Sequence, residues 1–226
     1  MSRPVSPYHA PGFYDRELAR GRHRDIVGGR WDETGRLQMA LLKAEGLEPR
    51  HWLLDIGCGA LRLGCKAVPY LEPGHYWGTD LSAELMARGY DRELAEADRP
   101  RLPRDQLVRD PDFAFQGVPP TITHAIAFAV FTHLPLPYLT HALGNLATRF
   151  PDLQSLLFTL FLAPEGHTGP FRQPDGVVTH PDRAPWHLTG AGWAPDGRLG
   201  AFRLDRRPDR LPRGQVLFRA TRVLAP

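Results

Sequence analysis

The segment LLDIGCGALRLG at residues 53–64 carries residue types suited to binding a nucleotide-like ligand. Gly57 and Gly59 would let the chain turn tightly, and would let a ligand approach the backbone with no side chain in the way. The spacing is GxGxxxxG, which differs from the GxGxxG of dinucleotide sites. Asp55 precedes the glycines, and a carboxylate there suits a ligand with an ammonium or sulfonium group better than a pyrophosphate.

A second acid, Asp80, follows the short apolar segment YWGT and lies 21 residues after Gly59. A carboxylate at the end of a second strand can accept two hydrogen bonds from a ribose diol. The alternative is that Asp80 caps the next helix, a role that Ser82 fills better. Each feature is weak alone, but together in one strand–helix–strand unit they predict a nucleoside site.

Several further side chains could take part in chemistry or in binding. Arg62 could hold a carboxylate of the cofactor or pair with an acid on the surface, and His23 and Arg24 could close over the same group. Cys58 is favoured as a small buried filler of the loop over a nucleophile, because no base is placed beside it. An arginine-rich turn is favoured as a solvated surface over an anion site; its arginines are Arg203, Arg206, Arg207, Arg210 and Arg213.

Strands and helices alternate along the chain, which indicates a mostly parallel sheet with helices on both faces. Ligands bind such sheets beyond the carboxyl ends of the strands. The predicted strands span 51–56, 76–79, 106–109, 122–131 and 156–162, followed by an antiparallel hairpin of 197–204 and 215–223. The predicted helices span 35–45, 61–71, 82–97, 136–150 and 183–191.

Length and composition suit one globular domain, with 226 residues, 42% hydrophobic and 23% charged. The net charge is +3 and the arginines are scattered, which argues against a nucleic-acid surface. No apolar run approaches the roughly 20 residues of a membrane span, and two cysteines exclude a disulfide scaffold. We therefore expect a cytoplasmic protein with an extension over 1–24 and one domain over 25–226.

Two segments could cover a ligand as lids. The extension over 1–24 carries Tyr8, Phe13 and Tyr14, and the Pro- and Gly-rich segment 163–190 is the second candidate. Its aromatic and histidine residues are Phe171, His180, Trp186 and His187. Their aromatic content favours an apolar or aromatic ligand.

These motifs resemble those of the class I S-adenosylmethionine-dependent methyltransferases. LLDIGCG is similar to their first motif and YWGTDLS to their second. HRDIVGGRW at 23–31, VFTHLP at 130–135 and PRGQVLF at 212–218 extend the likeness over roughly residues 23–223. The pattern resembles a subfamily with a DIGCG-x-LR-x-G motif and a later VFTHL segment, which marks a small-molecule methyltransferase but no particular substrate.

The resemblance implies a Rossmann-like, mostly parallel, seven-stranded sheet that ends in an antiparallel hairpin. It also implies S-adenosylmethionine as cofactor, S-adenosylhomocysteine as product, and direct transfer of the methyl group to a small-molecule acceptor. No metal is implied. The residues expected to bind the cofactor are Asp55, Gly57, Cys58, Gly59, Arg62, Asp80, Leu81, Asp112, Phe113 and Phe128, with Asp110 as an equal structural candidate for Asp112.

His133 is the candidate catalytic residue, because it follows the fourth strand, where acceptor and methyl group would meet. It could act as a general base or simply tie its loop to the next helix. The chain departs from the family at Ala60, Thr123 and Ala129, where relatives carry Gly, Ser or an acid; this bears on catalysis more than on cofactor binding. Three other functions stay open: a nicotinamide dehydrogenase, a non-methylating protein on the same fold, and an RNA methyltransferase.

Overall fold

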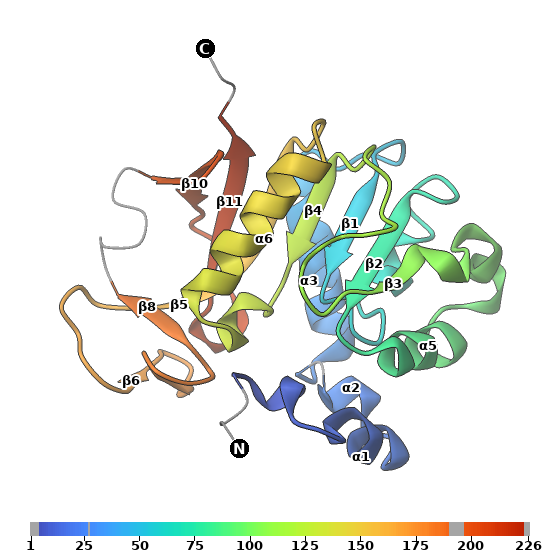
Figure 1. Cartoon of the computed structure of the whole chain (residues 1–226). Coiled ribbons are helices and arrows are strands. Elements are labelled where there is room, and N and C mark those ends of the chain that lie inside the picture. The colour runs from blue at the N-terminus through green and yellow to red at the C-terminus, as the bar shows by residue number, and fades with distance from the viewer. Residues whose placement is uncertain (1–4, 27, 190–196, 224–226) are drawn as a thin grey trace.

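A nine-stranded sheet runs through the centre of the protein, with its main path in the order β3-β2-β1-β4-β5-β11-β10-β9 (Figure 1). The computed structural model describes residues 5–26, 28–189 and 197–223. The strands of this sheet are β1 (Leu53–Ile56), β2 (Tyr76–Asp80), β3 (Leu107–Arg109), β4 (His124–Ala127), β5 (Ser155–Ala163), β8 (His187–Thr189), β9 (Arg198–Leu199), β10 (Phe202–Arg206) and β11 (Val216–Arg222).

The first five strands of the sheet are parallel, and β11 lies antiparallel between β5 and β10. This confirms the predicted parallel sheet with a C-terminal antiparallel hairpin. The predicted strand over 197–204 is divided into β9 and β10, which pair antiparallel, and β8 lies outside the seven predicted strands. Because β10 is antiparallel to β11, it runs in the same direction as β5, and the loop after it lies at the carboxyl end of the parallel strands.

Helices cover both faces of the sheet because the buried strands present apolar side chains alternately to each side. Leu54 packs in the cluster that contains α6 (Leu136–Arg149), whereas Leu53 packs in the cluster that contains α3 (Trp31–Ala44) and α5 (Ala83–Arg92). Figure 1 shows α6 in front of the sheet and α3 behind it. Within the described residues, no helix is long and apolar enough to span a bilayer.

The predicted helices over 35–45, 82–97 and 136–150 are present with shifted ends, but the one over 61–71 is much shorter. Its α-helical part is α4 (Gly64–Ala67). Leu61 has a positive φ of 64°, which an α-helix does not accommodate, and Pro69 lacks the N–H that a continuing helix would use. The chain therefore turns once after the glycine loop before it becomes helical.

The predicted helix over 183–191 is wrong where it can be seen, and residues 190 and 191 lie outside the described part. Instead, β8 pairs in parallel with the end of β5, with His187 opposite Phe161. Pro181 and Pro185 disfavour a helix here, and the end of β5 offers backbone groups for pairing. The preceding segment forms a small hairpin of β6 (Phe171–Arg172) and β7 (Val178–Thr179).

The chain before α3 forms short helices that lie below the sheet in Figure 1. They are a 3-10 turn (Pro7–His9), α1 (Phe13–Ala19) and α2 (His23–Ile26), and both α1 and α2 contact α5. Ile26 is buried with Ala60 and Leu85, and aromatic side chains of the extension pack around them. The extension is therefore part of the wall above the glycine loop.

Candidate functional site

The glycine loop after β1 is held in place by the end of β2. The backbone N–H groups of Gly57 and Cys58 both donate to the Thr79 carbonyl, at 2.7 and 3.0 Å. Gly57 and Gly59 have φ values of 71° and 56°, in the left-handed region that favours glycine. A Cβ on Gly57 would lie 2.5 Å from Val130 Cγ2, so the loop approaches the segment after β4 closely. The predicted need for glycine at both positions has this physical basis.

Asp80 connects the glycine loop to the start of α5. Its Oδ2 accepts from the backbone N–H of Gly59 and its Oδ1 from that of Ser82, both at 2.9 Å. Burial raises the pKa of this carboxyl, while the backbone N–H donors act in the opposite direction. Ser82 caps α5 by accepting from the Leu85 N–H, so Asp80 is not the side chain that caps this helix.

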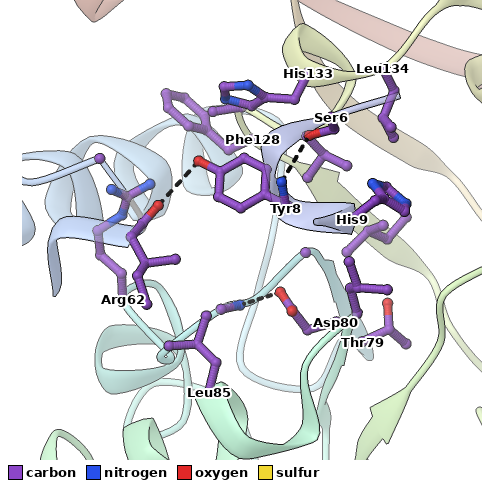
Figure 2. A pocket seen from close by; sticks show the side chains of 18 of the residues that line it. Ser6, Tyr8, His9, Arg62, Thr79, Asp80, Leu85, Phe128, His133 and Leu134 are labelled. Atoms are coloured by element: carbon purple, nitrogen blue, oxygen red, sulfur yellow. Dashed lines mark hydrogen bonds between the residues drawn. The ribbon is translucent and has the colours of Figure 1, made fainter. Parts of the chain in front are cut away.

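A cavity opens at the carboxyl ends of the parallel strands, and Figure 2 shows its wall at close range. Most of the predicted site residues line it, although their contact with a cofactor stays a prediction. They are Gly57, Gly59, Arg62, Asp80, Leu81, Phe113, Phe128 and the candidate catalytic residue His133. The topology therefore gathers segments from four different strand ends at one rim.

Asp55 and Cys58 do not line this cavity. Asp55 is buried beneath the loop, where its Oδ2 accepts from the Tyr76 hydroxyl at 2.7 Å, and burial raises its pKa to about 7. Cys58 packs against β2, so closely that a Cβ on Gly78 would lie 2.8 Å from its Sγ. Both residues point away from the ligand side, and direct contact of either with a cofactor is not supported by this geometry.

Asp110, rather than Asp112, is the acid at the third strand end that lines the cavity. Its two oxygens accept from the backbone N–H groups of Ala114 and Phe115, each at 2.9 Å. Asp112 lies off the cavity, with its carbonyl 3.1 Å from Nε2 of His141. The structure thus selects the alternative register, because the chain turns back on itself immediately after Asp110.

Arg62 lies in the wall between the glycine loop and the N-terminal extension. It is 8% exposed, and its Nη1 donates to the Gly29 carbonyl at 3.4 Å. Burial lowers the pKa of its guanidinium to about 10, so it remains a cation at neutral pH. A buried cation on the cavity wall is suited to an anionic group of a ligand.

His133 lies on the 3-10 turn Phe131–His133 that follows β4. Its ring stands edge-to-face with that of Tyr8, with centroids 5.0 Å apart. Figure 2 shows the two side chains next to each other. Burial lowers the pKa of His133 to about 4, and the positive charge of Arg213 adds to this effect. The imidazole is therefore neutral at pH 7, which leaves a lone pair available to accept a hydrogen bond, while the same burial opposes its protonation.

The N-terminal extension supplies cavity residues, whereas the described part of segment 163–190, which ends at residue 189, does not. Ser6, Tyr8, His9 and Tyr14 line the cavity, and the Tyr8 hydroxyl donates to the Ile26 carbonyl at 3.2 Å. The sequence predicts Tyr8 and Tyr14 as lid residues because they are aromatic. It offers no reason to select Ser6 or His9. In segment 163–190, Phe171, His180, Trp186 and His187 all lie outside the cavity wall.

His23 and Arg24 do not face the cavity as predicted. Both bind the carboxylate of Glu93 at the end of α5: Arg24 through two nitrogens at 2.8 and 2.7 Å, and His23 at 2.5 Å. The Glu93 side chain is only 6% exposed. These contacts attach α2 to α5 and so hold the extension in place.

Arg213 and Gln215 line the cavity, and sequence reasoning missed both. Arg213 was grouped with the solvated arginines of the last hairpin, yet its Nη2 donates to the Gly28 carbonyl at 2.9 Å. Gln215 is buried beneath it and bonds to Thr159. The sequence does not reveal that the loop after β10 lies near the site. That position depends on the order and direction of the strands in the sheet.

Comparison with known proteins agrees with this geometry. Residues 54–150 match a family model described as a methyltransferase domain. The fold resembles magnesium protoporphyrin IX methyltransferase from Synechocystis, solved with bound SAH, with a TM-score of 0.61 and 16% identity over 93% of this chain and 97% of that one. It also resembles the glycopeptide N-methyltransferase MtfA, with a TM-score of 0.58 and 15% identity over 85% and 90% of the two chains.

A third similar structure is the complex of DhpI with SAH, with a TM-score of 0.55 and 13% identity over 94% of this chain and 98% of that one. At these identities the likeness establishes the fold, and the matched residues of the family model include the glycine loop and Asp80. Residues 54–150 thus resemble a methyltransferase domain, and the chain has the Rossmann-like fold of the methyltransferase structures to which it is similar.

Proposed function

We propose that this protein is a class I methyltransferase that transfers the methyl group of S-adenosylmethionine to a small-molecule acceptor. The observation that carries the proposal is the position of Asp80. Its carboxylate lines the cavity at the end of β2 and is fixed by the N–H groups of Gly59 and Ser82. A carboxylate fixed beside a glycine loop at this strand end suits the two hydroxyls of a ribose.

The remaining cavity residues fit the other parts of the cofactor. Leu81 and Phe113 offer apolar surface for an adenine ring, with Asp110 nearby as an acceptor for its amino group. Arg62 would bind the carboxylate of the methionine portion. Phe128 would lie toward the sulfonium end. Asp55 and Cys58 would not contact the cofactor. They would support the conformation of the glycine loop from the side that faces away from the cavity.

The chemistry needs alignment more than it needs a reactive protein group. When bound, S-adenosylmethionine supplies an electrophilic methyl carbon; an acceptor lone pair forms the new bond as the carbon–sulfur bond breaks, leaving a neutral thioether. Holding the acceptor in line within about 3–3.5 Å accounts for much of the acceleration in such displacements. His133 lines the cavity and, being neutral, would accept a hydrogen bond from a hydroxyl or amine acceptor and orient it; its lowered pKa makes it a weak general base.

The N-terminal extension, residues 1–24, is proposed as a lid on the domain formed by 25–226. Tyr8 lies in the middle of the cavity wall in Figure 2, between His133 on one side and Asp80 on the other. Its hydrogen bond to Ile26 and the attachment of Arg24 to Glu93 hold this segment over the glycine loop. Such a lid would exclude water from the reacting groups.

A small-molecule acceptor is favoured by the enclosure of the site. The acceptor end is bounded by Tyr8, His133 and Arg213, which line the cavity from three separate segments of the chain. The magnesium protoporphyrin and glycopeptide methyltransferases named above act on porphyrin and glycopeptide acceptors, which is consistent with this class. The cytoplasmic location stays a prediction.

Calorimetric titration with S-adenosylhomocysteine, S-adenosylmethionine and NAD tests the proposal. We expect the two sulfur nucleosides to bind and NAD not to bind. Asp80→Asn should weaken binding at least about 10-fold, because one carboxylate oxygen is replaced by an amide that cannot accept the same hydrogen bond. Asp105→Asn, at an exposed acid outside the cavity, is the matched control and should bind as the parent does. Binding of NAD alone would overturn the assignment.

A further inference from the structure

One wall of the cavity carries hydrogen-bond donors that the proposed cofactor contacts do not use. Arg213 and Gln215 belong to the loop between β10 and β11, and both line the cavity. The charge of Arg213 acts on His133, Tyr8 and Arg62, so it lies near all three. The side chain of Arg213 is exposed, whereas Gln215 is buried. The pair therefore offers one charged donor at the mouth and one neutral donor deeper in.

Arg213 is held by its backbone as well as by its side chain. It has a φ of 66°, an unfavourable value for a residue with a side chain, and its backbone N–H donates to Oδ2 of Asp175 at 2.7 Å. The bond from Nη2 to the Gly28 carbonyl fixes the guanidinium toward the cavity. Because one nitrogen is engaged with Gly28, other N–H groups of the fork are available to a ligand.

Gln215 is oriented by a short hydrogen-bond chain. The hydroxyl of Thr159 accepts from the backbone N–H of Ala129 at 2.8 Å and donates to Oε1 of Gln215 at 2.7 Å. Ala129 has a φ of 61°, which marks the bend that follows β4. Since the amide oxygen is occupied by Thr159, the NH2 group of Gln215 is the end available to the cavity.

Among the described residues, the cavity wall carries three arginines, Arg30, Arg62 and Arg213, and two carboxylates. Its carboxylates, among the described residues, are Asp80 and Asp110, and each of their four oxygens accepts from a backbone N–H. No carboxylate of the described residues lines the part next to Arg213. His133 there is neutral, because its pKa is lowered by burial. The lining beside Arg213 therefore has positive charge and donors, and the nearby carboxylate of Asp175, which is outside the lining, binds the backbone of Arg213 and not its guanidinium.

From this arrangement we infer that the methyl acceptor carries a carboxylate, which Arg213 and the NH2 group of Gln215 bind. The guanidinium fork matches the two oxygens of a carboxylate, and one cation balances its single negative charge. The inference rests on the proposed function, because it assigns Arg62 to the carboxylate of the cofactor and leaves Arg213 for the acceptor. It makes Arg213 and Gln215 the residues that determine acceptor specificity.

The test uses the full chain saturated with S-adenosylhomocysteine and titrated calorimetrically with paired probes. Benzoate, phenylacetate, 4-hydroxybenzoate and indole-3-acetate are each compared with the neutral primary amide of the same skeleton. We expect at least one carboxylate to bind about 10-fold or more tightly than its amide. Arg213→Gln should abolish this preference, and Arg210→Gln, at an exposed arginine of the same loop outside the cavity, should retain it.

A second variant keeps the test independent of any damage from the loss of Arg213. Gln215→Glu preserves an oxygen for the Thr159 hydroxyl but replaces the NH2 donor by an acceptor, so carboxylate binding should weaken while S-adenosylhomocysteine binding persists. The inference is overturned if no carboxylate is preferred to its amide, if the preference survives in Arg213→Gln, or if phenyl phosphate binds more tightly than every carboxylate. It is also overturned if Arg213→Gln weakens S-adenosylhomocysteine binding instead, because Arg213 would then serve the cofactor.

Failure of the inference can be told apart from failure of the proposed function. The proposed function fails when S-adenosylhomocysteine does not bind the unmodified protein, before any acceptor probe is added. The inference fails when that nucleoside binds but the carboxylate preference or its dependence on Arg213 is absent.

Discussion

Gly89 in α5 lies against the backbone of Ala60, so closely that a Cβ on Gly89 would be 2.3 Å from the Ala60 carbonyl oxygen. The contact brings α5 directly onto the glycine loop, next to Gly59. It has to be made by glycine, because the atoms it would strike are main-chain atoms that cannot move aside. The packing of α5 and the shape of the proposed cofactor loop are therefore coupled.

Gly89→Ala is expected to lower the free energy of unfolding by about 1–3 kcal/mol, because the added methyl overpacks a backbone contact. It should also weaken S-adenosylhomocysteine binding, since the displaced loop contains Gly59. Gly144→Ala in α6 is the control: a Cβ there meets nothing within 4 Å, so we expect a gain of up to about 1 kcal/mol from helix propensity. Urea unfolding and calorimetry measure both effects, and equal stabilities of the two variants would contradict the coupling.

The buried Asp55 should make stability fall as the pH rises. Burial raises its pKa to about 7 in the folded protein, above the value of about 3.9 for an unfolded chain, so the unfolded state releases its proton first. Between these two values the contribution of this group to stability decreases by up to about 1.4 kcal/mol per pH unit. Asp55→Asn should remove this component, which urea unfolding at pH 4.5 to 7.5 would detect as a shallower decline.

Tyr76→Phe provides the complementary test at the same carboxyl. The Tyr76 hydroxyl donates to Asp55 and thereby favours the ionised form, so its removal should raise the pKa of Asp55 further and extend the decline to higher pH. An unchanged pH profile in both variants would show that Asp55 does not titrate in this window.

His133 should remain neutral throughout the physiological range. Its pKa is lowered to about 4 by burial and, secondarily, by the charge of Arg213. We expect its ring signals in an NMR titration to be constant from pH 6 to 8, with His133→Gln used to assign them. Arg213→Gln should move the midpoint upward and Arg210→Gln should not, since Arg210 does not line the cavity. A midpoint near 6.5 in the parent protein would contradict the buried, neutral state.

Glu93 should control how firmly the N-terminal extension is held. Its carboxylate binds His23 and Arg24, and Arg24 is largely exposed, so Glu93→Ala should cost only about 1 kcal/mol of overall stability. Hydrogen exchange over residues 5–26 should nevertheless rise, and S-adenosylhomocysteine binding should weaken several-fold if the extension is a lid. Glu48→Ala, which breaks an exposed pair with Arg50, serves as control and should change neither property. Unchanged exchange in Glu93→Ala would argue against the attachment.

The part of the site that the sequence predicts well is the part formed by neighbouring segments. The loop from Gly57 to Gly59 and the acid at Asp80 belong to one strand–helix–strand unit, so short-range spacing and turn chemistry suffice to place them. The same local logic identified Ser82 as the helix cap. Where two adjacent acids compete, as Asp110 and Asp112 do, only the backbone turn decides between them.

The acceptor end could not be placed from the sequence, because it is assembled from distant segments. Tyr8 and Arg213 are separated by most of the chain. They line the same cavity because β11 is antiparallel to both β5 and β10, which puts the loop between β10 and β11 at the carboxyl end of the parallel strands. The sequence shows two arginines in the same loop and cannot tell which of them faces the cavity. In the structure Arg213 lines the cavity and Arg210 does not. Similarly, Asp55 was expected to face the ligand, and its partner Tyr76 lies 21 residues away on the next strand.

The position of β11 between β5 and β10 also divides the protein into parts that can be altered separately. Two of the three segments that bound the proposed acceptor end, Ser6 to His9 and Pro212 to Gln215, lie outside residues 54–150, which hold the proposed nucleoside site and His133. An engineer could exchange these flanking pieces while leaving the nucleoside-holding core intact. The sheet order thus offers a practical route to redirecting such a scaffold toward new acceptors.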